Sequence, residues 1–246
     1  MYDHPKFLSS GDSCLVVEFS DSIEMDANLR LQHLRRKLTE IGVKGVRELV
    51  PTYRSLYVHF DPVKLPRRKL EAVVNGAMEN PGESMATEKR VLVMPVAYGG
   101  EFGPDMTSVA EHTKLEESEI VKRHTSGDYY CYMLGFTPGF GYLGGLDESL
   151  AAPRLKTPRK LIKAGSVGIA GNQTGAYSID SPGGWRLIGR TPLKLFDPDN
   201  NDNPTLIDAG DWIKFRCISK DEFETIKRGV DDGTYAPERL ALKNGG

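Results

Sequence analysis

The first eighty residues alternate apolar runs of strand type with a stretch whose apolar residues recur at helical spacing. Residues 14–19 (CLVVEF) read as a strand. The apolar residues that follow are separated by four, three, four and three positions, which predicts one helical face made of Ala27, Leu31, Leu34, Leu38 and Ile41. Two β-prone runs come next, at 46–50 and 54–60, and Pro66 stands where a first-turn proline opens a second helix.

This order, β-α-β-β-α, predicts a small N-terminal α/β domain of ferredoxin-like form, in which helices cover one face of a sheet. We expect a further strand within residues 90–97 to complete that sheet. Residues 80–88 (NPGESMATE) combine Pro, Gly and Ser without an apolar period, so they are the best linker candidate and a preferred site of proteolysis. The predicted domains are therefore 1–85 and 86–246.

The second predicted domain begins with a helical segment and continues with short β-prone runs. A short amphipathic helix is expected over 116–123, ending near His124. Short β-prone runs separated by Gly, Pro, Asn and Asp then indicate a closed β-barrel, with strands at 129–134, 166–170, 186–188, 193–196 and 212–218. One last helix follows Asp221, and the tail from Asp231 has little to pack. The predicted fold class is α+β and mainly β.

Composition narrows the class of partner. The chain has 32 basic and 34 acidic residues, so its net charge of -2 provides no field for holding nucleic acid. Its apolar runs are too short to cross a bilayer, and the start MYDHPKFLSSGDS lacks a signal region, so we expect a cytoplasmic protein without a membrane partner. Three widely spaced cysteines and histidines without helical i, i+4 pairing predict no metal site.

Nucleotide-binding motifs do not account for the glycines of the chain. Residues 139–144 (GFGYLG) match G-x-G-x-x-G, but Gly145 and Pro153 bracket only seven residues, too few for the helix that must follow a dinucleotide turn. No G-x-x-x-x-G-K-[ST] sequence is present. Any ATP used must therefore be held in another way or by another chain.

Two glycine-rich segments, 135–145 and 173–185, carry aromatic and neutral polar side chains that could wall a pocket for an amide, urea or lactam. The candidate lining residues are Phe136, Phe140, Tyr142, Gln173, Thr174, Tyr177 and Ser181. Arg154, Arg159 and Arg190 could receive a carboxylate or phosphate. The alternative, in which the aromatics brace barrel turns and the arginines are solvated, stays open at this point.

A long resemblance includes these same segments. GFTPGFGYLGGLDESLAAPRLKTPR and AGSVGIAGNQTGAYSIDSPGGWRLIGRTPLKLFDP resemble the family called allophanate hydrolase subunit 1, which is related to carboxyltransferase domains and includes KipI and 5-oxoprolinase B subunits (PxpB). The resemblance extends over residues 10–219 and implies an α/β domain followed by a cyclophilin-like β-barrel. The chain departs from the family pattern at Lys163, Ala176 and Ser178, on turns that would shape the rim of the pocket.

The resemblance implies a subunit of an ATP-dependent 5-oxoprolinase-type amidohydrolase that opens the lactam of 5-oxoproline and is inert alone. Its implied partners are a homologous second subunit (KipA- or PxpC-like) and a LamB- or PxpA-like subunit, which would bind or help to bind ATP. Gln173, Thr174 and Tyr177 would hold the amide, Arg190 the acid group, and His124 would transfer protons. The alternatives are a KipI-like inhibitor of a sensor histidine kinase and a carboxyltransferase or allophanate hydrolase-type subunit that acts on urea-like substrates.

Overall fold

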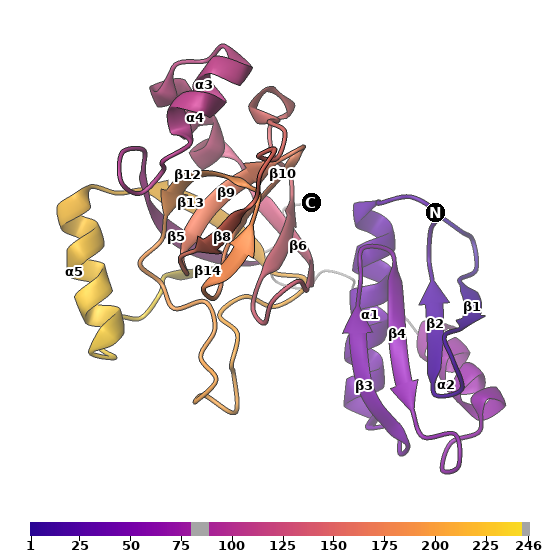
Figure 1. Ribbon diagram of the computed structural model, residues 1–246. Helices are drawn as coiled ribbons and strands as arrows, with labels where there is room; N and C mark the ends of the chain where they lie inside the picture. Colours follow the sequence, from indigo (N-terminus) through magenta and orange to yellow (C-terminus); the bar gives the residue numbers. More distant parts are fainter. Residues whose placement is uncertain (80–88, 243–246) are drawn as a thin grey trace. The chain divides into compact units, whose positions relative to one another are not determined.

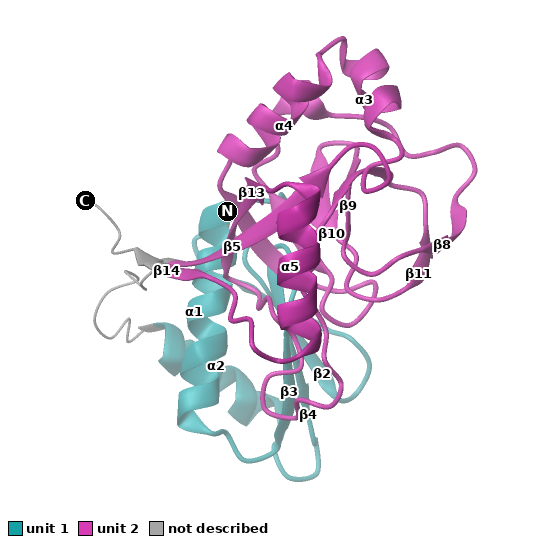
Figure 2. Ribbon diagram, turned by 90° about the vertical axis from the view of Figure 1, so that its left-hand side faces the viewer, with its two compact units in different colours: residues 1–87 teal, residues 88–246 magenta. Residues whose placement is uncertain are grey.

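The computed structural model describes residues 1–79 and 89–242 (Figure 1). The chain divides into two compact units, Met1–Thr87 and Glu88–Gly246 (Figure 2). The predicted linker at 80–88 lies outside the described residues.

The first unit is a four-stranded antiparallel sheet with two helices. The strand order is β1 (Lys6–Ser9), β2 (Cys14–Glu18), β4 (Ser55–Phe60) and β3 (Val46–Pro51). Helices α1 (Met25–Ile41) and α2 (Arg67–Glu79) cover one face of the sheet (Figure 1). Leu31, Leu34 and Leu38 of the predicted helical face are buried in one core with Leu15 and Val58 of the strands. Ile41, which the spacing also placed on that face, is 55% exposed, because the helix ends there and Gly42 follows.

The expectation that residues 90–97 complete this sheet is wrong. The edge position belongs to β1, which forms a hairpin with β2 and pairs Phe7 with Val17. Residues 89–98 form β5, a strand of the second unit. Val91, Leu92, Val93 and Met94 of β5 are all buried, so this strand needs cover on both faces, which a sheet with one open face does not supply.

The second unit is a closed barrel of seven strands. Their order is β12 (Arg186–Arg190), β9 (Ser166–Ala170), β10 (Gln173–Ala176), β7 (Gly141–Gly144), β6 (Tyr129–Leu134), β13 (Trp212–Cys217) and β5 (Lys89–Tyr98), and β5 pairs with β12 to close the ring. The β13–β5 pairing is parallel, and the other pairings are antiparallel.

Several further elements surround the barrel. Helices α3 (Met106–Thr113) and α4 (Glu117–Ser126) lie at one end and α5 (Lys220–Asp231) on the outside (Figure 1). The short 3-10 helix η1 (Glu148–Leu150) follows β7. Strands β8 (Arg159–Ile162) and β11 (Ser181–Gly183) form a separate ribbon, and β14 (Arg239–Leu242) pairs with β5.

The predicted barrel is confirmed, with three corrections to its strands. Residues 193–196 form no strand, and only Phe196 makes an isolated bridge, to Thr205. Two glycine-rich segments that read as turns contribute β7 and β10, because glycine permits close packing between strands and side chains. The tail after Asp231, which was expected to have little to pack, forms strand β14, and this strand pairs with β5.

Candidate functional site

Five aromatic rings from the two glycine-rich segments gather on one side of β7 and β10. They belong to Phe136, Phe140, Tyr142, Tyr177 and Trp185. The Phe140 ring lies at the centre, with ring centroids of Tyr142, Tyr177 and Trp185 at 5.4, 5.6 and 5.5 Å. All these contacts are edge-to-face, the arrangement that aromatic quadrupoles favour. The predicted aromatic residues are thus brought together.

Most of this aromatic cluster is closed to solvent. Phe140, Tyr177 and Trp185 are buried, and burial raises the pKa of the Tyr177 hydroxyl. Phe136 is 59% exposed and has a φ of 63°, a left-handed conformation that is uncommon for a residue with a Cβ. The cluster therefore braces the barrel, as the structural alternative expected, and it presents one exposed ring at its edge.

The β8–β11 ribbon packs directly on the aromatic cluster. A Cβ on Gly183 would lie 2.3 Å from the Tyr177 hydroxyl oxygen, so only glycine permits this approach. Ser181 pairs with Ile162, which itself belongs to the cluster. The Ser181 hydroxyl is buried and has no hydrogen-bond partner within the described part of the chain.

A hydroxyl pair joins the two predicted segments. The Ser178 hydroxyl donates to the carbonyl oxygen of Pro138 at 2.6 Å, and the Thr137 hydroxyl lies 3.1 Å from it. Because the Ser178 hydrogen is used on Pro138, Thr137 is the donor in the second contact. Neither hydroxyl is among the predicted site residues. The resemblance placed Ser178 on a turn at the pocket rim, but a single Ser or Thr beside a turn does not show which group it will bond.

His124 and Thr174 lie elsewhere, in the barrel interior. Neither has exposed surface. His124 Nε2 lies 2.8 Å from Thr174 Oγ1, and His124 Nδ1 lies 2.7 Å from the Tyr98 hydroxyl oxygen. Thr174 also donates to the carbonyl of Gly168 at 3.1 Å. These positions conflict with the predicted roles of His124 in proton transfer and of Thr174 as an amide ligand, because both side chains make their hydrogen bonds to other core groups and neither reaches solvent.

The hydrogen-bond pattern selects one form of His124. The single hydroxyl hydrogen of Thr174 is donated to the Gly168 carbonyl, so His124 Nε2 must carry the hydrogen that it donates to Thr174. His124 Nδ1 then has no hydrogen and accepts a hydrogen bond from the Tyr98 hydroxyl. Burial lowers the pKa of His124 to about 3. The ring also packs on Phe215, with centroids 4.4 Å apart. His124 is therefore a neutral core residue.

Arg190 lines a cavity of about 420 Å³ on the barrel's flank. The walls come from the turn around Ser178, the loop after β12 and helix α5. The lining residues are Ala164, Ser178, Ile179, Asp180, Arg190, Thr191, Pro192, Leu193, Lys194, Phe196, Phe223, Lys227, Val230 and Asp231. Arg190 Nε donates to the carbonyl of Ala164 at 3.0 Å. Ser178 links this cavity to the Phe136 loop, so Arg190 and the exposed aromatic ring belong to one region.

The remaining predicted residues do not line this cavity. Gln173 and Tyr142 are half-buried, at the start of β10 and within β7. Arg154 is exposed, while Arg159 is occupied by an ion pair with Asp105, so it is not a free anion-binding group.

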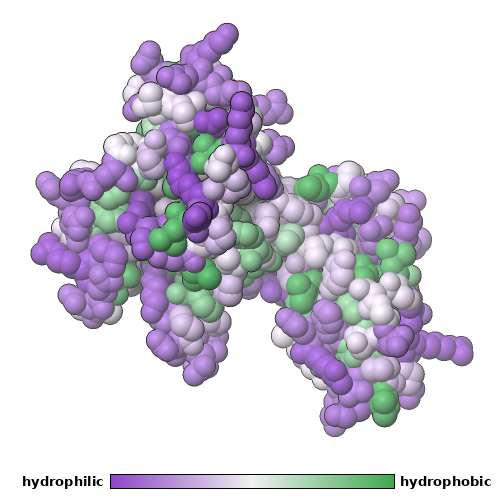
Figure 3. All heavy atoms as spheres, viewed as in Figure 1, coloured by the Kyte–Doolittle hydropathy of each residue, from purple (hydrophilic) through white to green (hydrophobic). Residues whose placement is uncertain are grey.

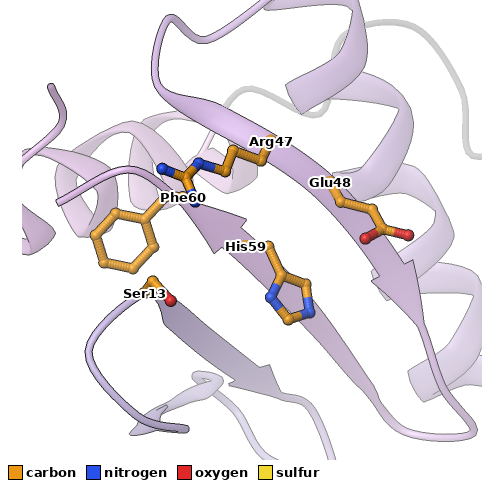
Figure 4. Close-up of a pocket in the computed structure, with 5 residues that line it drawn as sticks. All are labelled: Ser13, Arg47, Glu48, His59 and Phe60. Carbon is orange, nitrogen blue, oxygen red and sulfur yellow. The ribbon is translucent and has the colours of Figure 1, made fainter.

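The first unit holds a second hollow, of about 310 Å³, lined by Ser13, Arg47, Glu48, His59 and Phe60 (Figure 4). Cys14, His59 and Glu48 stand side by side on three strands, and Cys14 Sγ lies 4.0 Å from His59 Nε2. Burial raises the pKa of the Cys14 thiol, which disfavours the reactive thiolate. Within residues 1–79 and 89–242, no three His, Cys, Asp or Glu side chains converge as a metal site.

Comparison with known proteins now decides the family. The family model for the carboxyltransferase domain, subdomain C and D, matches residues 5–207. The chain belongs to this family. The chain is also 40% identical over 227 residues to the 5-oxoprolinase B subunit of Bacillus subtilis, covering 88% of this chain and 94% of that protein. It is 39% identical to the 5-oxoprolinase B subunit of Escherichia coli O157:H7, covering 83% of this chain and 92% of the relative.

Solved structures of the family share the fold. The crystal structure of TTHA0988 is 32% identical with a TM-score of 0.75, and the alignment covers 84% of this chain but 40% of that longer chain. PH0987 from Pyrococcus horikoshii is 41% identical with a TM-score of 0.52, covering 89% of this chain and all of that one. The K. lactis urea amidolyase, at 19% identity and a TM-score of 0.74, supports the fold alone.

The family match ends before helix α5, which begins at Lys220. Yet Phe223, Lys227 and Val230 of α5 form one wall of the Arg190 cavity. The sequence predicts this helix but not its role in the site. Its amphipathic spacing places Phe223, Ile226 and Val230 on one face, and the outward surface of α5, at the left in Figure 3, is mainly hydrophilic. That spacing indicates that α5 packs against the barrel, but it does not show which part of the barrel the helix contacts.

Proposed function

We propose that the chain is the B subunit of a 5-oxoprolinase, an ATP-dependent enzyme complex that opens the lactam ring of 5-oxoproline. The observation that carries the proposal is the 40% identity to the Bacillus subtilis protein, which extends over 94% of that relative. Because both chains align over nearly their whole lengths, the similarity concerns the complete subunit and not one shared domain. The urea amidolyase of Saccharomyces cerevisiae is 23% identical and is covered to only 14%, so a urea substrate has weaker support.

In this proposal the chain binds and orients, and partner subunits supply the nucleotide chemistry. The Arg190 guanidinium suits a single carboxylate, and the Ser178 hydroxyl lines the same cavity. Gln173 and Tyr177, the other predicted amide ligands, are not among the residues that line it. We place ATP outside this cavity, because a triphosphate carries several negative charges and Arg190 is the one cation of the described lining without an ion pair. The sequence also contains no P-loop. We therefore assign ATP to a homologous second subunit or a third, LamB-like subunit.

The described part of the chain contains no helix long and apolar enough to span a membrane. Cys14, Cys131 and Cys217 are free thiols, as expected for a protein that works in the reducing cytoplasm.

The decisive experiment is reconstitution. We would measure phosphate release with and without 5-oxoproline for this chain alone, for the partner subunits alone and for the full mixture. Stimulation by 5-oxoproline is expected only in the full mixture. Full activity of the partners without this chain would contradict an enzymatic role and favour the kinase-inhibitor alternative, while stimulation by urea instead of 5-oxoproline would favour the carboxyltransferase alternative.

A further inference from the structure

The cavity beside Arg190 combines one charged wall with an apolar floor. Leu193 and Phe196 come from the loop after β12, and Phe223 and Val230 come from α5. Its volume of about 420 Å³ exceeds that of a small ring with a carboxyl group, and it falls within the range of small-molecule sites. Shape and lining therefore suit a small organic molecule with one polar end.

Arg190 is the group that gives this cavity its charge preference. Its Nε is fixed by the Ala164 carbonyl, and its two Nη atoms have no hydrogen-bond or ion-pair partner among the described residues. The anchoring bond orients the guanidinium plane, so less side-chain entropy is lost when an acceptor binds. The Nη edge can therefore receive the two oxygens of one carboxylate.

The other charged groups of the cavity are already paired. Lys194 pairs with Asp197 at 2.7 Å, and Lys227 pairs with Asp231 one helical turn away. Asp180 pairs with Lys163 at 2.8 Å, and this contact, more than the charge of Arg190, lowers the pKa of its carboxyl. Arg190 thus remains as the one cation of the described lining without an ion pair, which matches a monoanion better than a phosphate ester or a dicarboxylate.

We propose that this cavity is the binding site for the carboxylate of a small cyclic amide acid, with Arg190 holding the carboxylate and α5 setting the size of ligand that fits. The identity of the acid as 5-oxoproline rests on the proposed function. Since α5 lies beyond the family match, its residues Phe223 and Val230 would determine the specificity of this particular chain.

The test is a direct binding measurement on the full-length chain, alone and with its partner subunits, by calorimetry and ligand-observed NMR. The probes are L-5-oxoproline and 2-pyrrolidinone, which is the same lactam without the carboxylate. We expect the Arg190→Gln variant to bind 5-oxoproline at least about tenfold more weakly, the range of a lost charged hydrogen-bond pair. Arg190→Lys should recover part of the affinity for 5-oxoproline. The wild type and Arg190→Gln should bind 2-pyrrolidinone equally weakly.

Two further variants separate binding from folding. Val230→Phe adds volume on the helix wall, leaves Arg190 intact and should block binding. Arg123→Gln removes a half-buried arginine that pairs with Glu119 on α4, outside the cavity, and this variant should bind 5-oxoproline like the wild type. Melting temperatures of all variants establish that they are folded.

The outcomes distinguish the two proposals. Wild-type affinity in Arg190→Gln, or no binding by the wild type either alone or with partners, overturns the cavity proposal. An active complex whose KM for 5-oxoproline is unchanged by Arg190→Gln also overturns it, and the proposed function then stands. If 5-oxoproline binds in an Arg190-dependent way but does not stimulate ATP hydrolysis by the complex, the cavity proposal stands and the proposed function is rejected.

Discussion

Arg159 of the β8–β11 ribbon and Asp105, the residue that precedes α3, form a two-point ion pair. Arg159 Nη1 and Nη2 each donate to a different Asp105 oxygen, both at 2.8 Å. The same carboxylate accepts the backbone N–H of Leu187 in β12 at 2.8 Å. One buried acid therefore ties together the ribbon, a barrel strand and the start of a helix.

Asp105→Ala should loosen this junction. The substitution leaves the Arg159 guanidinium and the buried Leu187 N–H without their acceptor, so we expect a loss of about 2 kcal/mol or more in the free energy of unfolding. Chemical denaturation measures this loss. Hydrogen exchange should also accelerate in the ribbon before it does in the rest of the barrel.

The control is Arg216→Ala, which removes a pair of the same chemistry at the surface. Arg216 and Glu222 are 2.8 Å apart, and both side chains are more than 40% exposed. Such a pair contributes about 0–1 kcal/mol. Equal losses in the two variants would contradict the special role of Asp105.

His124 should remain neutral over the whole physiological range. Its pKa in the folded chain is about 3, compared with about 6.5 when unfolded. The unfolded state therefore binds more protons between these two values. Its contribution to stability is complete above pH 6.5 and is lost as the pH falls toward 3, by up to about 1.4 kcal/mol for each pH unit.

Nitrogen NMR of labelled histidine checks both charge and tautomer. The His124 signals should show a proton on Nε2, bound to Thr174, and should not change between pH 5 and 8. A titration near pH 6.5 would show that the ring is accessible to solvent and would restore it as a candidate for proton transfer.

Gly183→Ala should destabilise the contact between the ribbon and the aromatic cluster. The new Cβ would meet the Tyr177 hydroxyl at 2.3 Å and Ile162 Cδ1 at 2.8 Å, so the ribbon must shift. Overpacking of this kind costs about 1–3 kcal/mol. Gly76→Ala is the matched control: it lies within α2 with open space around it, and alanine should stabilise that helix by up to about 1 kcal/mol. Thermal denaturation of both variants should show opposite shifts.

Trp185→Ala should lower stability more than it lowers affinity for a ligand at Arg190. Trp185 is buried, packs edge-to-face on Phe140 and belongs to the aromatic cluster, not to the lining of the Arg190 cavity. Removing a buried indole costs about 3–5 kcal/mol. Urea denaturation gives the loss, and ligand titration below the unfolding transition gives the affinity. A large loss of affinity with unchanged stability would move the binding site to the cluster.

Some of the candidate site could be predicted because local chemistry is visible in the sequence. Glycine-rich turns with aromatic residues identified Phe136, Phe140, Tyr142 and Tyr177 as neighbours, and the structure brings their rings together. Thr174 lies in the same segment but on the opposite side of β10, because successive side chains of a strand point to opposite faces. A segment that reads as a turn offers no way to assign those faces. The sequence therefore could not separate Thr174 from Tyr177.

The spacing of apolar residues was enough by itself to predict that α1 is a helix and β4 a strand, because the period of burial is a local property. The tertiary structure alone decided which segments meet. Lys89–Tyr98 joins the barrel because Trp212–Cys217, more than a hundred residues later, covers its edge, and Arg190 gains a cavity because α5 folds back beside it. Such pairings depend on burying two distant surfaces together, and no local pattern contains that information.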